Sequence, residues 1–332
     1  MEIKGNSRIA GIGAFLPPDR VTSESLMDEI DSTRFGAPKN YISKCIGIKE
    51  RRISDARTLP SDMAIAASHN ALEDAGLEAG EIDMILYCGI DRDWQEPATA
   101  HRVQTELGAT RATVLDVTNA CHGFMNGLAI ADSFISNGAV DNVLVCTGEK
   151  PSRVMLEAIE QIKRTNNKEE FKRWIGSLTV GDAGGAMVVQ RGTAHSGWQW
   201  MEMRSEGQHA ELCYYRHTQA GVEGQMIMGL ISRVFVGLHK KLIDKTYRAL
   251  NWSPTDIDVM YCHQVGAIPH KQLTSAADLD LNCAPITYDF LGNLTSASIP
   301  VNMALNRPKR GDKLLVLGAG SGLSICQAGM IY

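Results

Sequence analysis

The chain has 332 residues, of which 44% are apolar and 21% charged, and its formal net charge is −5 at pH 7. This composition is typical of a well-packed soluble protein with two domains or one duplicated domain, and the weak negative charge gives no electrostatic reason to bind nucleic acid or an anionic membrane. The chain has no signal-like start and no apolar run of the roughly 18 residues that a spanning helix needs, so we expect a cytoplasmic protein without a membrane partner.

Short apolar runs alternate with segments of helical periodicity, which predicts an α/β fold with substantially buried strands. The clearest early helix is expected over residues 61–75, with Ser61 or Asp62 as its cap and Gly76 as its end. Eight cysteines are scattered without CxxC pairs, and most lie in apolar runs. We therefore expect reduced, buried thiols and no metal site.

The same order of elements occurs twice along the chain. Residues 81–83 (EID) precede the run MILYCG, as residues 256–258 (DID) precede VMYCH. The runs NVLVCTG and KLLVLGAG form a second matching pair at a spacing of roughly 170 residues. A helix followed by DID and a strand is also common in unrelated α/β proteins. Two matches in the same order nevertheless predict a duplicated fold, divided into residues 1–178 and 179–332.

Two segments do not fit this repeat. Residues 151–178 are charged and helical, and residues 198–235 are rich in Met, His and aromatic side chains. We expect inserted helices that cap a pocket, with adaptable Met side chains in its wall. Ordinary helix core explains the same residues equally well.

Cys121 differs from the other cysteines in its context. The run ATVLDVT is typical of a buried strand, NAC of a tight turn, and the following residues of an amphipathic helix that ends at Asn137-Gly138. A thiol at such a helix N-terminus is expected to favour its nucleophilic thiolate form. A buried structural cysteine is the competing interpretation.

The segment DVTNACHGFMNGL around Cys121 resembles the nucleophile segment of the ketoacyl synthase III group of thiolase-superfamily condensing enzymes. Five further segments resemble motifs of that group in the same order: GIKERR, TVGDAGGAMVV, CHQVGAIPH, FLGNLTSASIP and LGAGSGL. The resemblance covers nearly the whole chain. It implies a thiolase fold, which is a duplicated αβαβα architecture of five layers, with helical insertions that cap an acyl tunnel.

By this resemblance, His263 and Asn293 donate hydrogen bonds to the thioester oxygen that becomes negative during condensation. The backbone N–H groups of Cys121 and Ser321 would hold the oxyanion that forms when Cys121 accepts its acyl group, with Gly320 beside the substrate. The closing loop GAGSGLS lacks the second cysteine of thiolases, and the single His with Asn differs from the two histidines of elongating synthases.

A finer likeness concerns the OleA-type head-to-head condensing enzymes, which DRDWQEPATAHRV resembles more closely than it resembles fatty-acid initiators. In that subfamily a glutamate before PATA is the base and reaches the active site of the neighbouring subunit, and Glu96 matches it. The competing interpretation is an exposed loop carboxylate, because the spacing from Glu96 to Cys121 is one residue shorter than in the subfamily. His122 replaces a residue that is usually small or apolar, and it would tune the thiol or line the pocket.

The resemblance implies an acyltransferase that joins two acyl thioesters through a Cys121 acyl-enzyme to a β-keto product, head-to-head and without decarboxylation. Three alternatives stay open: a decarboxylative synthase that uses malonyl-acyl carrier protein, a ketosynthase that forms α-pyrones, and a non-catalytic partner subunit of a condensing heterodimer.

No permanently bound cofactor is expected, because coenzyme A or the phosphopantetheine of an acyl carrier protein carries the substrate. Tyr41 matches the family's aromatic residue that stacks on the adenine of coenzyme A, and Arg51 and Arg52 are candidates for its phosphates. The resemblance also implies a homodimer, with a heterodimer as the alternative.

Overall fold

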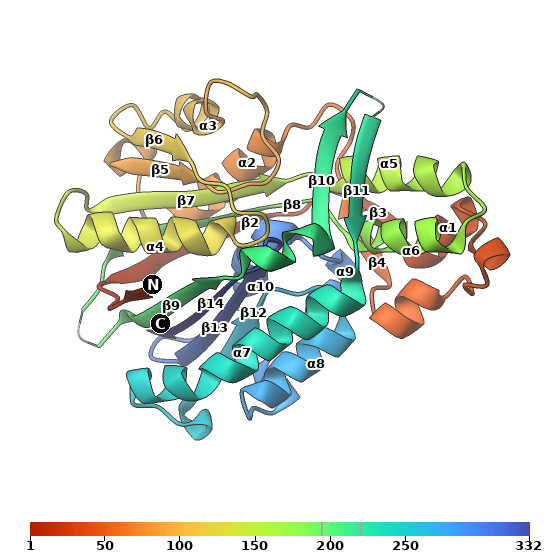
Figure 1. Ribbon diagram of the computed structural model, residues 1–332. Coiled ribbons are helices and arrows are strands. Elements are labelled where there is room, and N and C mark those ends of the chain that lie inside the picture. Colours follow the sequence, from red (N-terminus) through yellow and green to blue (C-terminus); the bar gives the residue numbers. More distant parts are fainter. Residues whose placement is uncertain (194, 220) are drawn as a thin grey trace.

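The computed structural model describes residues 1–193, 195–219 and 221–332, and two five-stranded sheets form its framework (Figure 1). The first sheet has the strand order β2 (Ser7–Phe15), β8 (Ala183–Arg191), β7 (Asn142–Glu149), β5 (Met84–Tyr87) and β6 (Thr113–Asp116). The second has the order β1 (Glu2–Ile3), β9 (Gly197–Ser205), β14 (Ser324–Ile331), β13 (Lys313–Gly320) and β12 (Val259–Cys262). Two hairpins stand outside the sheets: β3 (Asp19–Thr22) with β4 (Glu50–Ile53), and β10 (Cys213–Thr218) with β11 (Gly221–Met226).

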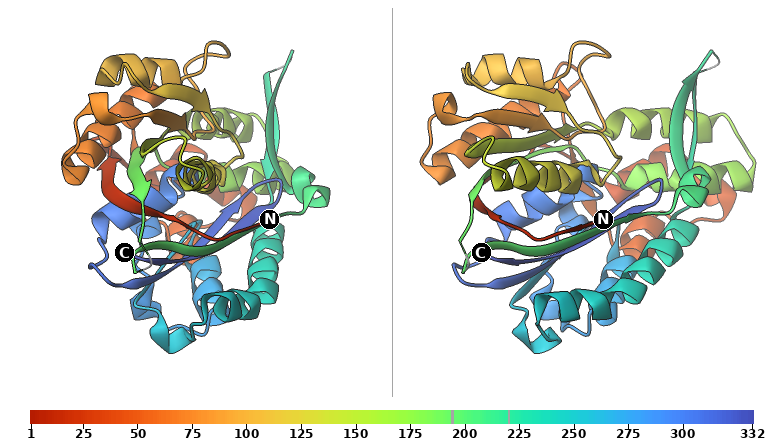
Figure 2. Two further views of the ribbon diagram at one scale, coloured as in Figure 1. Left: turned by 90° about the vertical axis from the view of Figure 1, so that its left-hand side faces the viewer. Right: turned by 60° about the vertical axis from the view of Figure 1, so that its left-hand side comes forward.

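Helices separate and cover the two sheets, which gives five layers (Figure 2). Helices α2 (Pro60–Ala75) and α3 (Ala100–Leu107) cover the outer face of the first sheet, and α4 (Gly123–Ser136) and α10 (Ser298–Leu305) lie between the sheets. Helices α7 (Met228–Leu250) and α8 (Ala267–Ala276) cover the outer face of the second. The remaining helices are α1 (Ser23–Glu29), α5 (Ser152–Lys163), α6 (Lys168–Trp174) and α9 (Tyr288–Leu291). The predicted five-layered α/β architecture is therefore confirmed. None of the described helices combines the length and apolar character needed to cross a membrane.

The predicted duplication is visible in matching hydrogen bonds. The Asp83 N–H donates to the Asn142 carbonyl at 2.9 Å, and the Asp258 N–H donates to the Lys313 carbonyl at 3.0 Å. The Asp83 carboxylate accepts from the Asn142 N–H at 3.0 Å, and the Asp258 carboxylate accepts from the Lys313 N–H at 2.8 Å. The two aspartates thus join the start of β5 to β7 and the start of β12 to β13 in the same way, so the repeated sequence encodes a repeated strand junction.

Two sequence-based boundaries need correction. Strand β8 pairs with β2 and β7 of the first sheet, so the two halves divide between β8 and β9, later than the predicted division at residues 178 and 179. The predicted insertion over residues 198–235 is also wrong in part, because its first residues form β9 of the second sheet and its centre forms the β10–β11 hairpin. Only the segment 151–178 provides the inserted helices, α5 and α6.

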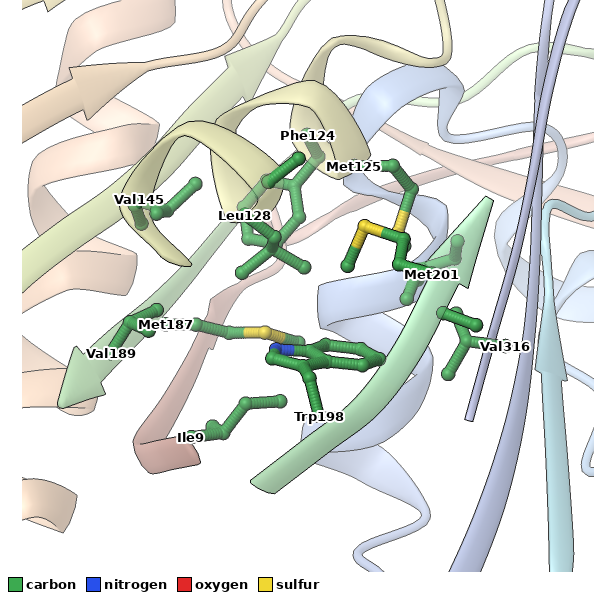
Figure 3. Close-up of a cluster of buried hydrophobic side chains, with 14 of the residues drawn as sticks. Ile9, Phe124, Met125, Leu128, Val145, Met187, Val189, Trp198, Met201 and Val316 are labelled. Atoms are coloured by element: carbon green, nitrogen blue, oxygen red, sulfur yellow. The ribbon is translucent and has the colours of Figure 1, made fainter. Parts of the chain in front are cut away.

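One apolar core joins the two sheets around α4 (Figure 3). Phe124 and Leu128 project from α4 toward Met187 of the first sheet and toward Trp198 and Val316 of the second, and all are buried. Burying side chains of this size stabilises the fold by about 1.5–3 kcal/mol each. Because α4 is packed from both sides, the turn at its N-terminus has a fixed position between the two halves.

Candidate active site

Cys121 lies in the turn between β6 and α4, which confirms the predicted strand–turn–helix placement. The turn is tight, since the preceding Ala120 has φ +48°. That left-handed conformation costs an alanine about 1–2 kcal/mol, so the surrounding structure must hold it. The C-terminal half approaches this turn closely, because a Cβ added to Gly320 would lie 2.7 Å from the backbone nitrogen of His122. A side chain at position 320 would therefore displace the turn that carries Cys121.

His263 and Asn293 come from the second half of the chain. His263 directly follows β12, and its N–H donates to the Leu317 carbonyl at 3.0 Å. The Asn293 N–H donates to the Thr179 carbonyl at 2.9 Å, and its side-chain Oδ1 accepts from the Thr295 N–H at 2.9 Å. Because the oxygen of the carboxamide is held in this way, its NH₂ group is the part left to donate to a ligand.

The three side chains line one small cavity of about 60 Å³. Gly320 and Ser321 of the closing loop line it as well. The rest of its wall is mainly apolar and consists of Thr179, Cys213, Met226, Met228, Ile231, Ser232, Phe235, Val265, Ala319 and Leu323. The structure thus brings together the cysteine of one half with the imidazole and carboxamide of the other.

The electrostatics of Cys121 differ from the expectation of a stabilised thiolate. Burial raises the pKa of the Cys121 thiol well above its usual range, and the neighbouring Cys213 and Glu149 raise it further. The free-energy cost of burying a thiolate at Cys121 exceeds the stabilisation that the thiolate gains from the N-terminus of α4. The thiol is therefore protonated at neutral pH, and its proton must leave as the sulfur attacks.

His263 is neutral in the same environment. Burial lowers the pKa of its imidazole to about 4, and the nearby His122 contributes to the decrease. A neutral imidazole has one N–H that donates and one nitrogen that accepts a proton. At neutral pH it is therefore able to exchange a proton with a thiol and to donate to an oxyanion.

Acidification is expected to destabilise the fold through three buried histidines. Burial lowers the pKa of His122 and His263 to about 4 and that of His239 to about 3. Histidines in the unfolded chain titrate near 6.5, so below about pH 6.5 the unfolded state binds more protons and the free energy of unfolding falls. Below about pH 6.5, each of these histidines lowers the free energy of unfolding by up to about 1.4 kcal/mol for each unit of pH decrease.

Urea denaturation at pH 7 and pH 5 measures this slope of the free energy of unfolding against pH. His239→Gln should reduce it, whereas the same change at the exposed His69 should leave it unaltered. A slope that is the same in His239→Gln as in the wild type would contradict the assignment.

A wide groove of about 1060 Å³ adjoins the cavity, and the two share Met226, Met228, Ser232 and Val265 in their walls. Tyr41 lines the groove. Its basic side chains are Lys172, Arg233, Lys240 and Lys271. The last three have no ion pair with any residue that the structure describes. The groove therefore presents a group of basic side chains beside the cavity.

These basic residues were not predicted from the sequence. Gly229, Arg233, Gly237 and Lys240 are spaced three or four residues apart on α7, so they share one face of that helix. This spacing predicts one basic helix face, but the start of α7 was predicted to belong to the insertion over residues 198–235, so the face was not identified.

Arg51 does not have the predicted phosphate-binding role. Its side chain is fully buried, and its guanidinium donates to the Leu178 carbonyl at 2.8 Å, the Ser23 hydroxyl at 3.0 Å and the Val21 carbonyl at 3.2 Å. Arg52 donates to the carbonyls of Pro17 and Pro18, and neither arginine lines the groove or the cavity. Arg51 therefore fastens the β3–β4 hairpin to the 3-10 helix Ile175–Thr179, which follows α6.

His122 also lies elsewhere than predicted. It is 1% exposed, it packs behind the turn against Gly318 and Gly320, and it is absent from the cavity wall. Its two ring nitrogens have no hydrogen-bond partner among the described residues. His122 therefore does not contact a substrate in the cavity. Its effect on the site is electrostatic, because it lowers the pKa of His263.

Glu96 is exposed in the loop between β5 and α3 and does not line the cavity of its own chain. The loop is firmly attached: the Ile90 N–H donates to the Glu149 carboxylate at 3.1 Å, and Asp91 accepts from the Lys150 N–H at 2.8 Å. Two large apolar side chains of the same loop, Ile90 and Trp94, are exposed by 41% and 42%.

The family model described as 3-oxoacyl-(acyl-carrier-protein) synthase III matches residues 115–207, and the model of its C-terminal part matches residues 247–330. The beta-ketoacyl-(acyl-carrier-protein) synthase III of Rhodospirillum centenum is 31% identical, over 96% of both chains. The acyl-CoA:acyl-CoA alkyltransferase of Xanthomonas campestris is 28% identical, over 98% of this chain and 99% of that protein.

A crystal structure of Xanthomonas OleA with bound cerulenin superimposes with a TM-score of 0.91 at 27% identity, covering 99% of this chain and 98% of that one. Solved variants of that OleA have a substituted cysteine, histidine or glutamate. Its cysteine and histidine are separated by the same number of residues as Cys121 and His263, and its glutamate precedes the cysteine by one residue more than Glu96 precedes Cys121. The chain belongs to the 3-oxoacyl-(acyl-carrier-protein) synthase III family of thiolase-superfamily condensing enzymes and is similar to its OleA-type members.

Proposed function

We propose that the protein joins two acyl thioesters head-to-head in a non-decarboxylative Claisen condensation. The observation that carries this proposal is the convergence of Cys121, His263 and Asn293 on one cavity. The name of the Xanthomonas relative, an acyl-CoA:acyl-CoA alkyltransferase, supports the choice of two acyl-CoA substrates.

In the first step the Cys121 sulfur attacks the carbonyl carbon of an acyl thioester. The thiol proton passes to the neutral imidazole of His263 and from there to the departing carrier sulfur, so the step yields an acyl-enzyme and a free carrier thiol. The backbone N–H groups of Cys121 and Ser321 hold the oxyanion of this step. Coenzyme A or a phosphopantetheine is the carrier, and its arm enters through the groove lined by Tyr41.

In the second step a base removes an α-proton from a second acyl thioester. His263 and Asn293 donate to the enolate oxygen, and the free NH₂ of Asn293 fits this task. The enolate carbon attacks the carbonyl of the Cys121 thioester, the carbon–sulfur bond breaks, and Cys121 regains a proton from the base. The product is a β-keto acyl thioester on the second carrier.

The relatives named beta-ketoacyl-(acyl-carrier-protein) synthase III make decarboxylative condensation with a malonyl carrier protein the second candidate. Incubating the enzyme with acyl-CoA alone separates the two. A β-keto thioester, or the ketone that remains after its hydrolysis to a β-keto acid and the loss of CO₂ from that acid, is expected without any malonyl donor. Product that forms only when malonyl-acyl carrier protein is added would favour the second candidate.

Glu96 is proposed as the base, and it would act in the cavity of a partner subunit. Its exposed position and the neighbouring Ile90 and Trp94 support a homodimer interface at this loop. The family's heterodimers, with one inactive subunit, are disfavoured because this chain retains Cys121, His263 and Asn293 together.

Replacing Glu96 with Gln is expected to reduce condensation by about 10²–10⁴-fold, the usual contribution of a general base. Acylation of Cys121 should continue, because it precedes the use of this base. Exchange of the α-hydrogens of bound acyl-CoA with deuterated solvent, followed by mass spectrometry, measures the base directly. Glu106→Gln, an exposed carboxylate on α3, is a matched control.

Hybrid dimers test the origin of the base. Mixing Cys121→Ala subunits with Glu96→Gln subunits should restore a fraction of the activity, since one of the two sites then combines an intact cysteine with an intact glutamate. Full exchange activity in Glu96→Gln would refute the assignment of the base, and lack of recovery in the hybrids would place the base within one chain.

A further inference from the structure

A second thiol lines the cavity of Cys121. Among the described cysteines, only Cys121 and Cys213 lie in its wall. Cys88, Cys146, Cys262 and Cys326 are buried in the strands and strand ends of the sheets, whereas Cys45 and Cys283 lie away from this cavity. Cys213 is thus the one thiol placed to react with the sulfur of Cys121.

The two thiols are close enough to influence each other. The cavity between its walls measures only about 60 Å³, and Cys213 is the largest charge influence on Cys121 after burial itself. Burial raises the pKa of Cys213 to about 11, and the neighbouring side chain of Ser321 offsets part of that rise. Both thiols are therefore held as neutral S–H groups that face the same small space.

The position of Cys213 allows it to approach Cys121. It begins β10 of the two-stranded hairpin, which pairs with neither large sheet and stands apart from them (Figures 1 and 2). A disulfide requires Cα atoms about 4.4–6.8 Å apart. Adjusting the end of a separate hairpin to this distance disrupts no hydrogen bond of the central sheets.

We propose that Cys213 is a resolving thiol that forms a reversible disulfide with Cys121 when a hydroperoxide enters the cavity. The Cys121 thiol passes its proton to the neutral imidazole of His263 as its sulfur attacks the hydroperoxide, so that Cys121 becomes a sulfenic acid and the peroxide leaves, with that proton, as water or an alcohol. The Cys213 sulfur then attacks the sulfenic sulfur, an S–S bond forms and water is released. Two thiols lose two electrons and the peroxide gains them, so the reaction is balanced.

The disulfide would protect the nucleophile. Without a nearby thiol, a sulfenic acid is oxidised further to sulfinic and sulfonic acids, which dithiols do not reduce. With Cys213 present, oxidation stops at the disulfide, and a dithiol restores both thiols. Activity is then lost and regained according to the supply of peroxide and reductant. This inference requires only that the two thiols share a cavity, and it holds whichever condensation the enzyme catalyses.

The test uses the full-length reduced protein and hydrogen peroxide. After oxidation, free thiols are alkylated and the unreduced protein is digested for mass spectrometry. We expect a peptide that links Cys121 to Cys213, with a mass lower than the sum of the two thiol peptides by two hydrogens, and its loss after dithiothreitol. Cys213→Ser should instead accumulate sulfinic acid at Cys121 and should not recover its Cys121 thiol.

Two controls keep the outcome interpretable. Cys283→Ser removes a partly exposed cysteine outside the cavity and should behave like the wild type. Cys213→Ala is a second variant in case the serine disturbs the hairpin, and circular dichroism checks that each variant is folded. Absence of the linked peptide in the wild type, or equal recovery of the Cys121 thiol in both Cys213 variants, would overturn the proposal.

Discussion

Replacing Cys121 with alanine is expected to abolish the acyl-enzyme and to reduce condensation by roughly 10⁴-fold or more, as loss of a covalent nucleophile does in other enzymes. The reason is geometric, because Cys121 is placed at the turn where His263 and the backbone of the closing loop converge. Serine should rescue little activity. Burial already raises the pKa of the thiol, and a hydroxyl is a far weaker acid in the same place.

Mass spectrometry of the intact protein after exposure to a series of acyl-CoA compounds measures this step directly. The wild type should gain the mass of one acyl group, and peptide mapping should place that group on Cys121. The alanine variant should gain none, whereas Cys283→Ser should acylate normally. An acyl group that persists on another residue in the Cys121→Ala protein would contradict the assignment.

Much of the fold was predictable because local patterns and long-range packing agree. Helix α4 has an apolar run, a tight turn before it and Gly138 with φ +78° after it, so its limits were evident from the sequence. The aspartates of the two repeated junctions make the same backbone contacts in each half. The limits of α4 depend on residues next to it in the sequence, and the aspartate junctions occur twice in the sequence. Both features can therefore be recognised from one amino-acid sequence.

Other features depend on tertiary packing and were assigned incorrectly. Adjacent residues of a strand point to opposite faces, so of Arg51 and Arg52 on β4 one had to face inward. Strand alternation would have predicted this, but both arginines were predicted as candidates for the phosphates of coenzyme A. The raised pKa of Cys121 follows first from burial and then from the charge influence of Cys213 and Glu149, which are distant in sequence, so no local pattern indicates it.

The two side chains opposite Cys121 are expected to differ in the step that they support. Asn293→Ala should lower the rate of condensation by about 10²–10³-fold, the usual effect of removing one oxyanion donor. Acylation of Cys121 should be almost unchanged, since its oxyanion is assigned to the N–H groups of Cys121 and Ser321. His263→Ala should slow both steps, because the imidazole also relays the thiol proton in the first. Rapid-quench measurements of acyl-enzyme formation and of product separate the two rates.

Asn293→Asp distinguishes hydrogen-bond donation from mere occupation of space. An aspartate keeps the shape of the side chain, but an ionised carboxylate accepts hydrogen bonds and repels a negative enolate. If Asn293 acts as a donor, the aspartate variant must condense more slowly than the alanine variant, although it fills the cavity better. It would also lie opposite the Thr295 N–H, which now donates to the carboxamide oxygen and would hold one carboxylate oxygen in its place. Faster condensation by the aspartate than by the alanine variant would show that Asn293 supports the loop and leaves the enolate to His263 alone.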